Sequence, residues 1–273
     1  AQDNAPMITT TPPDVQTSRT PESSWETWLE SPPGQYILQS EQALFNQAVT
    51  DVFGYYALQI GLPQLNTLQE NRVSLKLMLL PHGRATVDHN SPYQSIEGIP
   101  EELPFADQSI DLVILPHVLE FAQDPHQILR EVDRVLIPEG RVVISGFNPA
   151  SLWGARQYAG RLIGKNYLPR EGQFLSLLRI KDWLKLLDYS LDRGHFACYR
   201  LPLRKEKNMA RMAFLEKMGN RWWPIFGSVF LISAIKRHPG TRLVGRVPKQ
   251  SLQAIPQLNT AAQQSVQKVL EEV

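Results

Sequence analysis

The side chains best suited to chemistry are spaced in a way that excludes several common kinds of site. The six histidines show no metal-ligand spacing. The single cysteine, Cys198, excludes an internal disulfide and a cysteine-based zinc cluster. The chain also contains no G-x-S-x-G nucleophile elbow, no P-loop and no G-x-G-x-x-G turn. These observations argue against a hydrolase, a nucleotide hydrolase and an NAD-dependent enzyme, and we expect no metal centre.

Two ionisable residues close behind an apolar run are the clearest candidates for a site. His117 follows the run Ile110 to Leu115 and could either face a ligand or cap the helix that comes next. Glu120, three residues further on, could act as a base or lie on the surface of that helix. The sequence leaves both alternatives open for both residues, and it identifies no catalytic residue.

Apolar runs separated by turn residues predict alternating strands and helices around these candidates. Strands are predicted at 56–60, 73–80, 110–115, 141–145 and 227–235, and helices at 65–72, 125–136, 180–189 and 207–218. The second of these helices has Asp124 as its N-cap and Pro125 as its first residue. A strand, a capped helix and a strand in succession imply a right-handed parallel crossover. The sequence therefore predicts an α/β domain with a parallel sheet.

The stretch from Leu103 to Pro149, LPFADQSIDLVILPHVLEFAQDPHQILREVDRVLIPEGRVVISGFNP, resembles class I S-adenosylmethionine-dependent methyltransferases of the type 11 group. Weaker similarity extends from Phe53 to Lys236, and SGFNP resembles a small group of proteobacterial methyltransferase-like proteins. The resemblance implies a Rossmann-like fold, with a seven-stranded, mostly parallel sheet and helices on both faces. Gly227 to Ile235 is then the one antiparallel strand.

The resemblance also implies where a cofactor and a methyl acceptor bind. In open α/β sheets, the ligand crevice lies beyond the carboxyl ends of the strands. The positions that correspond to cofactor contacts for S-adenosylmethionine are Gly61, Pro100, Leu103, Leu115, Pro116 and His117. Those that correspond to the acceptor side are Phe147, Asn148 and Trp153.

The chain departs from the family pattern at three cofactor positions. Only Gly61 of the expected glycine-rich turn is present, since Pro63 and Leu65 stand where further glycines are expected. No carboxylate lies near Leu80, and Ile99 and Pro100 replace the usual Asp. Nearby acids that could substitute are Glu97, Glu101 and Glu102. Two functions follow: a methyltransferase with an unknown acceptor, or a non-catalytic binding or regulatory protein that retains the fold.

The two ends of the chain differ in composition from the middle. Residues 1–34 are rich in Pro, Thr and Ser and predict a disordered arm. Within this arm, Trp25, Trp28 and Leu29 have the spacing of one stripe of a short helix that could dock on the domain. We expect the methyltransferase-like domain at 35–240 and a flexible tail at 241–273.

Positive charge is concentrated in residues 199–250, which contain twelve Lys and Arg against Glu206 and Glu216, a balance of +10. This segment could contact a polyanion or form a solvated face. Trp222 and Trp223 beside Arg221 could stack a nucleic-acid base or cover the core. No run is long enough for a bilayer helix, and the single cysteine and the absence of a secretory signal favour the cytoplasm.

Overall fold

The computed structural model describes residues 24–83, 92–162, 168, 172–201, 212 and 214–237. The helices in these ranges are α1 (Ser24–Leu29), α2 (Pro32–Val49), α3 (Val118–Phe121), α4 (Pro125–Val135), α5 (Leu152–Leu162), α6 (Leu177–Leu186), α8 (Phe214–Trp222) and the 3-10 helix η1 (Pro224–Phe226). The strands are β1 (Tyr56–Ile60), β2 (Leu75–Leu80), β3 (Tyr93–Glu97), β4 (Ile110–Pro116), β5 (Leu136–Phe147), β6 (Tyr189–Ala197) and β7 (Val229–Lys236).

One seven-stranded sheet organises these elements, with the order β3-β2-β1-β4-β5-β7-β6. The first five of these strands pair in parallel, whereas β7 is antiparallel to both β5 and β6. The predicted fold class and the antiparallel strand near residues 227–235 are confirmed. Because β1 to β5 run the same way, their carboxyl ends meet at one edge of the sheet, where a ligand crevice forms in such folds.

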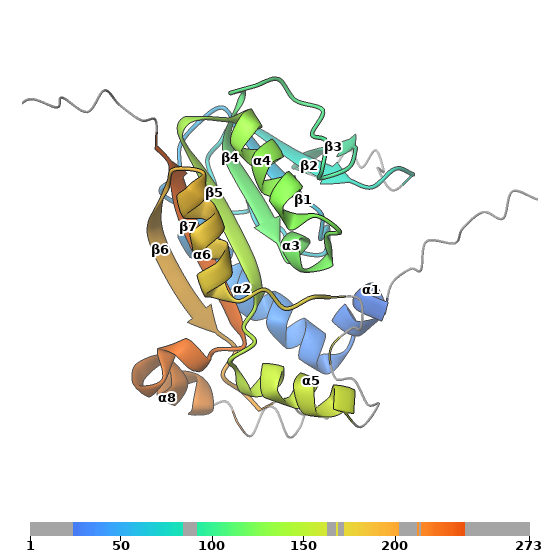
Figure 1. Cartoon of the computed structure of the whole chain (residues 1–273), viewed down its shortest axis with the longest axis vertical. Coiled ribbons are helices and arrows are strands. Elements are labelled where there is room, and N and C mark those ends of the chain that lie inside the picture. Colours follow the sequence, from blue (N-terminus) through green and yellow to red (C-terminus); the bar gives the residue numbers. More distant parts are fainter. Residues whose placement is uncertain are drawn as a thin grey trace, which may run out of the picture. The chain divides into compact units, whose positions relative to one another are not determined.

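Helices cover both faces of the sheet, and Figure 1 shows α4 and α6 in front of it and α2 behind it. On one face, Ile37 and Phe45 of α2 belong to the same buried cluster as Val143 of β5. On the other face, Ile128 of α4 and Ile180 of α6 share a cluster with the central strands. The central strand β4 is apolar and buried on both sides, as expected for a parallel strand between two helix layers.

Several predicted elements differ from the observed ones. Residues 61–74 form turns where a helix was predicted at 65–72, and their backbone bends around buried polar side chains described below. The helix predicted at 180–189 is α6, which ends at Leu186 because the chain enters β6 at Tyr189. Of the helix predicted at 207–218, the described residues are Met212, in a turn, and the part inside α8, whereas Lys207 and Arg211 lie outside them.

The N-terminal boundary also differs from the prediction. Helix α1 begins at Ser24, so the last part of the predicted arm at 1–34 is helical. Trp25 and Leu29 are buried there, as their helical spacing suggested. Residues 241–273 lie outside the described residues, so the predicted tail stays a prediction. No helix in the described part of the chain is long and apolar enough to cross a membrane.

The predicted N-cap of α4 is confirmed, and its contribution to stability can be tested by substitution. The Asp124 carboxylate accepts hydrogen bonds from the backbone N–H groups of His126 and Gln127. Asp124→Ala leaves these donors without a protein partner and should lower the free energy of unfolding by about 1 kcal/mol in urea denaturation. Asp124→Ser, which keeps a capping oxygen, should recover most of the loss. A parent-like Asp124→Ala variant would contradict this role.

Candidate functional site

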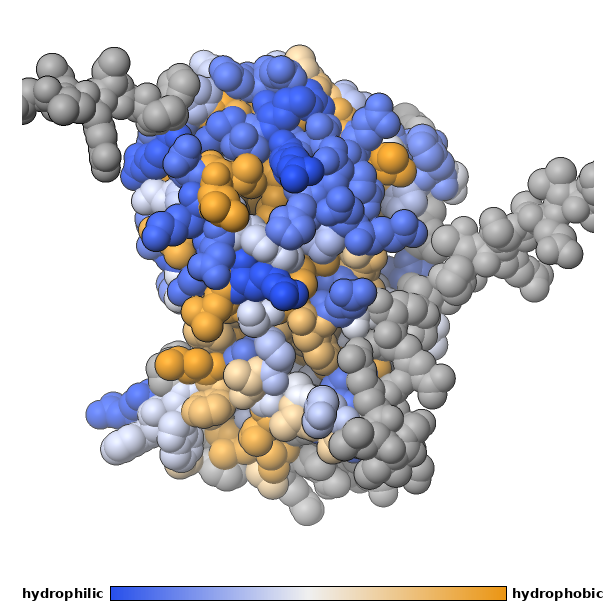
Figure 2. Space-filling model, in the orientation of Figure 1, coloured by the Kyte–Doolittle hydropathy of each residue, from blue (hydrophilic) through white to orange (hydrophobic). Residues whose placement is uncertain are grey.

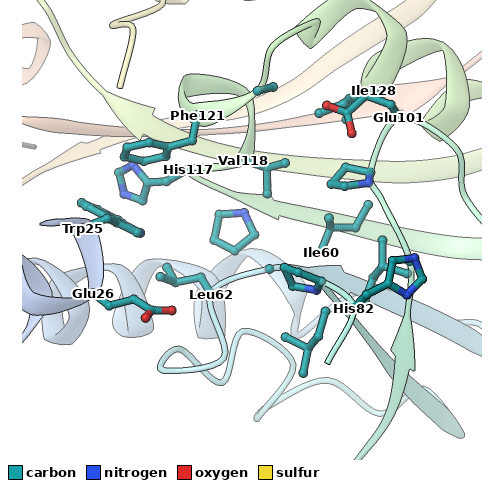
Figure 3. Close-up of a pocket in the computed structure, with 18 residues that line it drawn as sticks. Trp25, Glu26, Ile60, Leu62, His82, Glu101, His117, Val118, Phe121 and Ile128 are labelled. Atoms are coloured by element: carbon teal, nitrogen blue, oxygen red, sulfur yellow. The ribbon is translucent and has the colours of Figure 1, made fainter. Parts of the chain in front are cut away.

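A pocket of about 530 Å³ opens at the carboxyl edge of the sheet, and Figure 3 shows the side chains around it. Its walls come from the segments that follow β1, β2, β3 and β4, and α1 contributes Trp25 and Glu26. The lining residues are Trp25, Glu26, Ile60, Gly61, Leu62, Leu79, Leu80, Pro81, His82, Gly98, Pro100, Glu101, Pro116, His117, Val118, Phe121, Ala122 and Ile128. The volume lies in the range of small-molecule and cofactor sites.

The turn after β1 brings the backbone to the pocket without the usual run of glycines. Gly61 has a φ of +68° and Leu62 a φ of +48°, so two successive residues adopt the left-handed region. Such a conformation costs little at Gly61 and more at Leu62, because leucine carries a Cβ. The surrounding structure must therefore hold the turn in place.

The buried side chain of Gln59 provides that support. Its Nε2 donates to the carbonyl oxygens of Gly61, Leu62 and Leu65 at 2.8–3.1 Å. Its Oε1 accepts from the backbone N–H and the hydroxyl of Thr67. The Gln59 amide thus connects both sides of the turn to the end of β1. Its hydrogen bonds stabilise an unusual backbone conformation that further glycines would adopt at little cost.

His117 follows β4 in the left-handed region, with a φ of +56°, and its ring is buried between two carboxylates. Nδ1 lies 2.7 Å from Glu120 Oε2, and Nε2 lies 3.0 Å from Oε1 of Glu41 on α2. Glu120 Oε1 also accepts the backbone N–H of Phe147 at 2.5 Å. His117 occupies the N-cap position of α3, as one interpretation expected, but its side chain makes no capping hydrogen bond, and Glu120 is buried and does not lie on the surface.

The two carboxylates determine the protonation of His117. Burial by itself lowers the pKa of His117, but the charges of Glu41 and Glu120 outweigh this effect and raise the pKa to about 10. Burial raises the pKa of Glu120, while the nearby imidazolium opposes that rise. At neutral pH, His117 is therefore an imidazolium, hydrogen-bonded through Nδ1 to Glu120 and within ion-pair distance of Glu41 at Nε2.

Helix α1 closes one side of the pocket with an aromatic cluster. The ring of Trp25 is stacked on Trp28, with centroids 5.5 Å apart, and is tilted against His117 and Phe121 at 5.3 and 4.9 Å. Its edge also meets Phe147. Residues from the predicted arm thus form part of the pocket wall.

The structure separates the six predicted cofactor residues into two groups. Gly61, Pro100, Pro116 and His117 line the pocket. Leu103 and Leu115 are buried in the core beneath it and are not among the lining residues. Cofactor contact stays a prediction for all six.

The three residues predicted on the acceptor side are buried and do not line the pocket. Phe147 packs against His117, with ring centroids 4.5 Å apart. Asn148 fixes the backbone after β5, because its Nδ2 donates to the carbonyl oxygens of Ile225 and Gly227. Trp153 is buried in the core and donates from Nε1 to the carbonyl oxygen of Arg200. An acceptor role for these three stays a prediction.

Of the three acids considered as substitutes, only Glu101 lines the pocket. Glu97 is engaged nearby, since its carboxylate accepts the backbone N–H of Gly83 and lies 3.6 Å from His82 Nδ1. Glu102 is exposed. No group of three or more His, Cys, Asp and Glu side chains in the described part of the chain could hold a metal ion.

Sequence reasoning missed several residues of the site, although two of them carried a signal. Gln59 is a polar residue inside the apolar strand β1. Glu41 lies four residues after Ile37 and four before Phe45, on the buried stripe of α2. A polar side chain in such a position needs a partner. Glu26 and His82 carried no comparable signal, because only the tertiary arrangement brings them to the pocket.

Comparisons with known proteins agree with this fold. A family model described as a methyltransferase domain matches residues 71–144. The Escherichia coli protein YafS, described as uncharacterized, is 33% identical over 211 residues, which cover 77% of this chain and 80% of YafS.

Solved structures show the same fold. An S-adenosylmethionine-dependent methyltransferase from Thermotoga maritima, described as a possible histamine N-methyltransferase, has a TM-score of 0.54 at 16% identity and covers 78% of this chain and 94% of its own. A putative methyltransferase solved with the Haloferax volcanii Trm112 activator has a TM-score of 0.55 at 16% identity, over 79% and 99%. Together, the methyltransferase domain model and the YafS relative show that the chain belongs to the class I methyltransferase family, while the narrower proteobacterial subgroup stays a prediction.

The turn after β1 depends on Gln59, and this dependence can be measured. Gln59→Leu leaves three carbonyl groups and Thr67 without their partner, at about 1–3 kcal/mol for each buried group that stays unsatisfied. We expect a lower free energy of unfolding in urea. Gln69→Ala, an exposed glutamine on the same turn region, is the matched control and should behave like the parent. Equal losses in both variants would contradict this role for Gln59.

The imidazolium predicts a distinctive pH dependence of stability. Since the pKa of His117 rises from 6.5 to about 10 on folding, the native state binds more protons between these values. The stabilisation is complete below pH 6.5 and is lost as the pH rises through about 10. At about 1.4 kcal/mol for each pKa unit, the loss amounts to a few kcal/mol.

Urea denaturation between pH 7 and 10.5 measures this loss. Glu41→Gln removes one of the two charges that hold the proton on His117, so the midpoint of the fall should move to lower pH. The control is Glu30→Gln, which changes an exposed acid. An unchanged midpoint in Glu41→Gln would show that Glu41 does not hold this proton.

Proposed function

We propose that this chain binds S-adenosylmethionine in the pocket and transfers its methyl group to an acceptor that is still to be identified. The observation that carries the proposal is the pocket itself, which lies at the carboxyl ends of β1, β2 and β4. Gly61 presents backbone there with only Val118 near its missing side chain, so a ligand can approach closely. The family to which the chain belongs supports the same reaction class.

The residues present fit such a cofactor, although they differ from the family pattern. Ile60, Leu79 and Ile128 supply apolar walls suited to adenine. The family's acid after β2 is replaced by Pro81, but the Glu101 carboxylate reaches the same pocket from the β3–β4 connection. We propose that Glu101 accepts hydrogen bonds from the ribose diol.

The opposite side of the pocket suits the methionyl part of the ligand. Figure 3 shows Trp25, Glu26 and His117 together on one side, away from His82 and Glu101. Glu26 supplies negative charge for an ammonium group, and the Trp25 ring supplies an aromatic surface that is favourable near a cation. This orientation directs the reacting end of the ligand toward α1 and the segment after β4.

The chain's own residues act in the reaction chiefly by positioning. When bound, S-adenosylmethionine supplies a methyl group that is already activated by the sulfonium charge. Both ring nitrogens of His117 lie within 3.0 Å of a carboxylate oxygen, and the ring holds its proton. His117 therefore fixes the position of the pocket wall and does not serve as a base. Trp25 and Phe121 exclude water from that wall. Correct placement of two reactants can by itself supply a large part of a rate enhancement.

We also propose a cytoplasmic location for this activity. The single cysteine, Cys198, is buried and free, which is compatible with a reducing compartment.

Calorimetric titration of the full chain with S-adenosylmethionine and with its demethylated product tests the proposal. We expect both to bind, and Glu101→Gln to weaken binding by about tenfold or more, because a hydrogen bond to a charged acceptor contributes about 1.5–3 kcal/mol. Glu102→Gln, which changes the exposed neighbouring acid, should bind like the parent. No heat from the parent at millimolar ligand would overturn the proposed function in favour of the non-catalytic alternative. Parent-like binding by Glu101→Gln would overturn only the role of Glu101.

A further inference from the structure

The segment that leads into β7 exposes an unusual set of large apolar side chains. Trp222, Trp223, Ile225 and Phe226 are each more than half exposed, and Met218 is 40% exposed. We call these five residues the α8–η1 surface. Figure 2 shows apolar side chains gathered toward the lower end of the molecule, around the place where Figure 1 shows α8. Large exposed apolar patches generally mark a surface that meets a protein or a membrane.

The backbone beneath this surface is firmly held. The Glu216 carboxylate accepts the Tyr36 hydroxyl at 2.5 Å and the backbone N–H groups of Cys198 and Tyr199. Gly219 packs so closely on Tyr199 that a Cβ at this glycine would lie 2.3 Å from the ring. The Asn148 side chain holds the carbonyl oxygens of η1 and the residue after it. The apolar side chains are thus displayed by a fixed element.

The stretch of sequence that carries this surface is basic. Glu216 is the only acid between residues 207 and 237, and its carboxylate is already engaged in the interior. Arg221 is exposed directly beside Trp222. In sequence, the wider segment 199–250 carries a balance of +10, of which Lys236 and Arg237 lie at the far end of β7 and pair with Asp133 and Glu139. A partner of this surface must therefore combine an apolar layer with negative charge.

We infer that the α8–η1 surface docks on an anionic lipid bilayer. Tryptophan side chains are favoured at the level of lipid headgroups, and Ile225 and Phe226 can enter the boundary of the acyl chains. Basic residues near such a surface are attracted by the negative charge of anionic lipids. This inference does not depend on the proposed methyl transfer.

Two other occupants explain the surface less well. A second copy of the chain in a two-fold dimer would bring like charges together, which is unfavourable. A nucleic acid would use the tryptophans for stacking and the basic residues for phosphates. It would leave the aliphatic Met218 and Ile225 without a role. A lipid surface can contact the tryptophans, the basic residues and the aliphatic side chains.

Sedimentation of the full chain with vesicles tests the inference. The probes are vesicles of mixed phosphatidylglycerol and phosphatidylcholine and vesicles of phosphatidylcholine alone. We expect binding to the anionic vesicles that is about tenfold tighter than to the neutral ones and that weakens with added salt. Trp222→Ser/Phe226→Ser should reduce anionic vesicle binding by about tenfold or more, since it removes two apolar anchors. Because both side chains are exposed, its melting temperature should stay near that of the parent.

The matched control changes two exposed aromatic residues beside the amino end of β1. Phe53→Ser/Tyr55→Ser removes side chains that are 72% and 73% exposed, and it should bind vesicles like the parent. The inference is overturned if the parent binds neither kind of vesicle, or if both double variants bind like the parent or lose binding equally. If the parent does not bind vesicles but forms a concentration-dependent dimer that Trp222→Ser/Phe226→Ser abolishes, the surface is a dimer interface. If the parent instead retains RNA and the same variant does not, the surface binds nucleic acid.

Discussion

The imidazolium of His117, held between the carboxylates of Glu41 and Glu120, is the interaction on which the site depends. It joins α2, the end of β4 and α3, and Glu120 extends it to the backbone of Phe147 at the end of β5. A buried charge without a partner costs several kcal/mol, so each member of the cluster requires the others. His117 keeps a left-handed backbone although it carries a Cβ, and the contacts of its ring with the two carboxylates help to offset that cost. The contacts within this cluster therefore fix the position of the pocket wall.

The same cluster explains why His117 is a poor proton acceptor although it lines the pocket. Its two nitrogens are directed at carboxylates, and its pKa is raised to about 10, so it carries its proton throughout the neutral range. The chemistry that remains for this wall is orientation and the exclusion of water, to which Trp25 and Phe121 contribute from α1 and α3. A methyl transfer that relies on placement is compatible with such a wall.

The turn after β1 shows how a fold can keep a ligand-binding edge while its local motif changes. Families with this fold place several glycines there because the backbone must adopt unusual conformations close to the ligand. Here the buried Gln59 amide satisfies the carbonyl groups of the turn, and Tyr93 supports it further by accepting the backbone N–H of Leu68. Side-chain hydrogen bonds thus stabilise here the left-handed backbone conformations that glycines adopt at low cost in other members.

The sequence by itself determined the fold class, because local patterns encode it. The apolar run of β4, the Asp124 cap and the strand that follows α4 depend on neighbours within a few residues, so periodicity and capping rules identify them. The resemblance carried by Leu103 to Pro149 extended this to a seven-stranded, mostly parallel sheet with one antiparallel strand, whereas the order of the strands came from the structure.

Tertiary structure decided the composition of the site, because the contacts that create it join residues far apart in the chain. Glu41 lies on a helix more than seventy residues before its partner His117. Trp25 belongs to a stretch whose composition indicates disorder, yet its ring packs against His117, Phe121 and Phe147. A polar residue in an apolar stripe, such as Glu41, indicates that it has a buried hydrogen-bond or ion-pair partner. Only the folded chain identifies that partner, because residues distant in sequence surround the buried side chain.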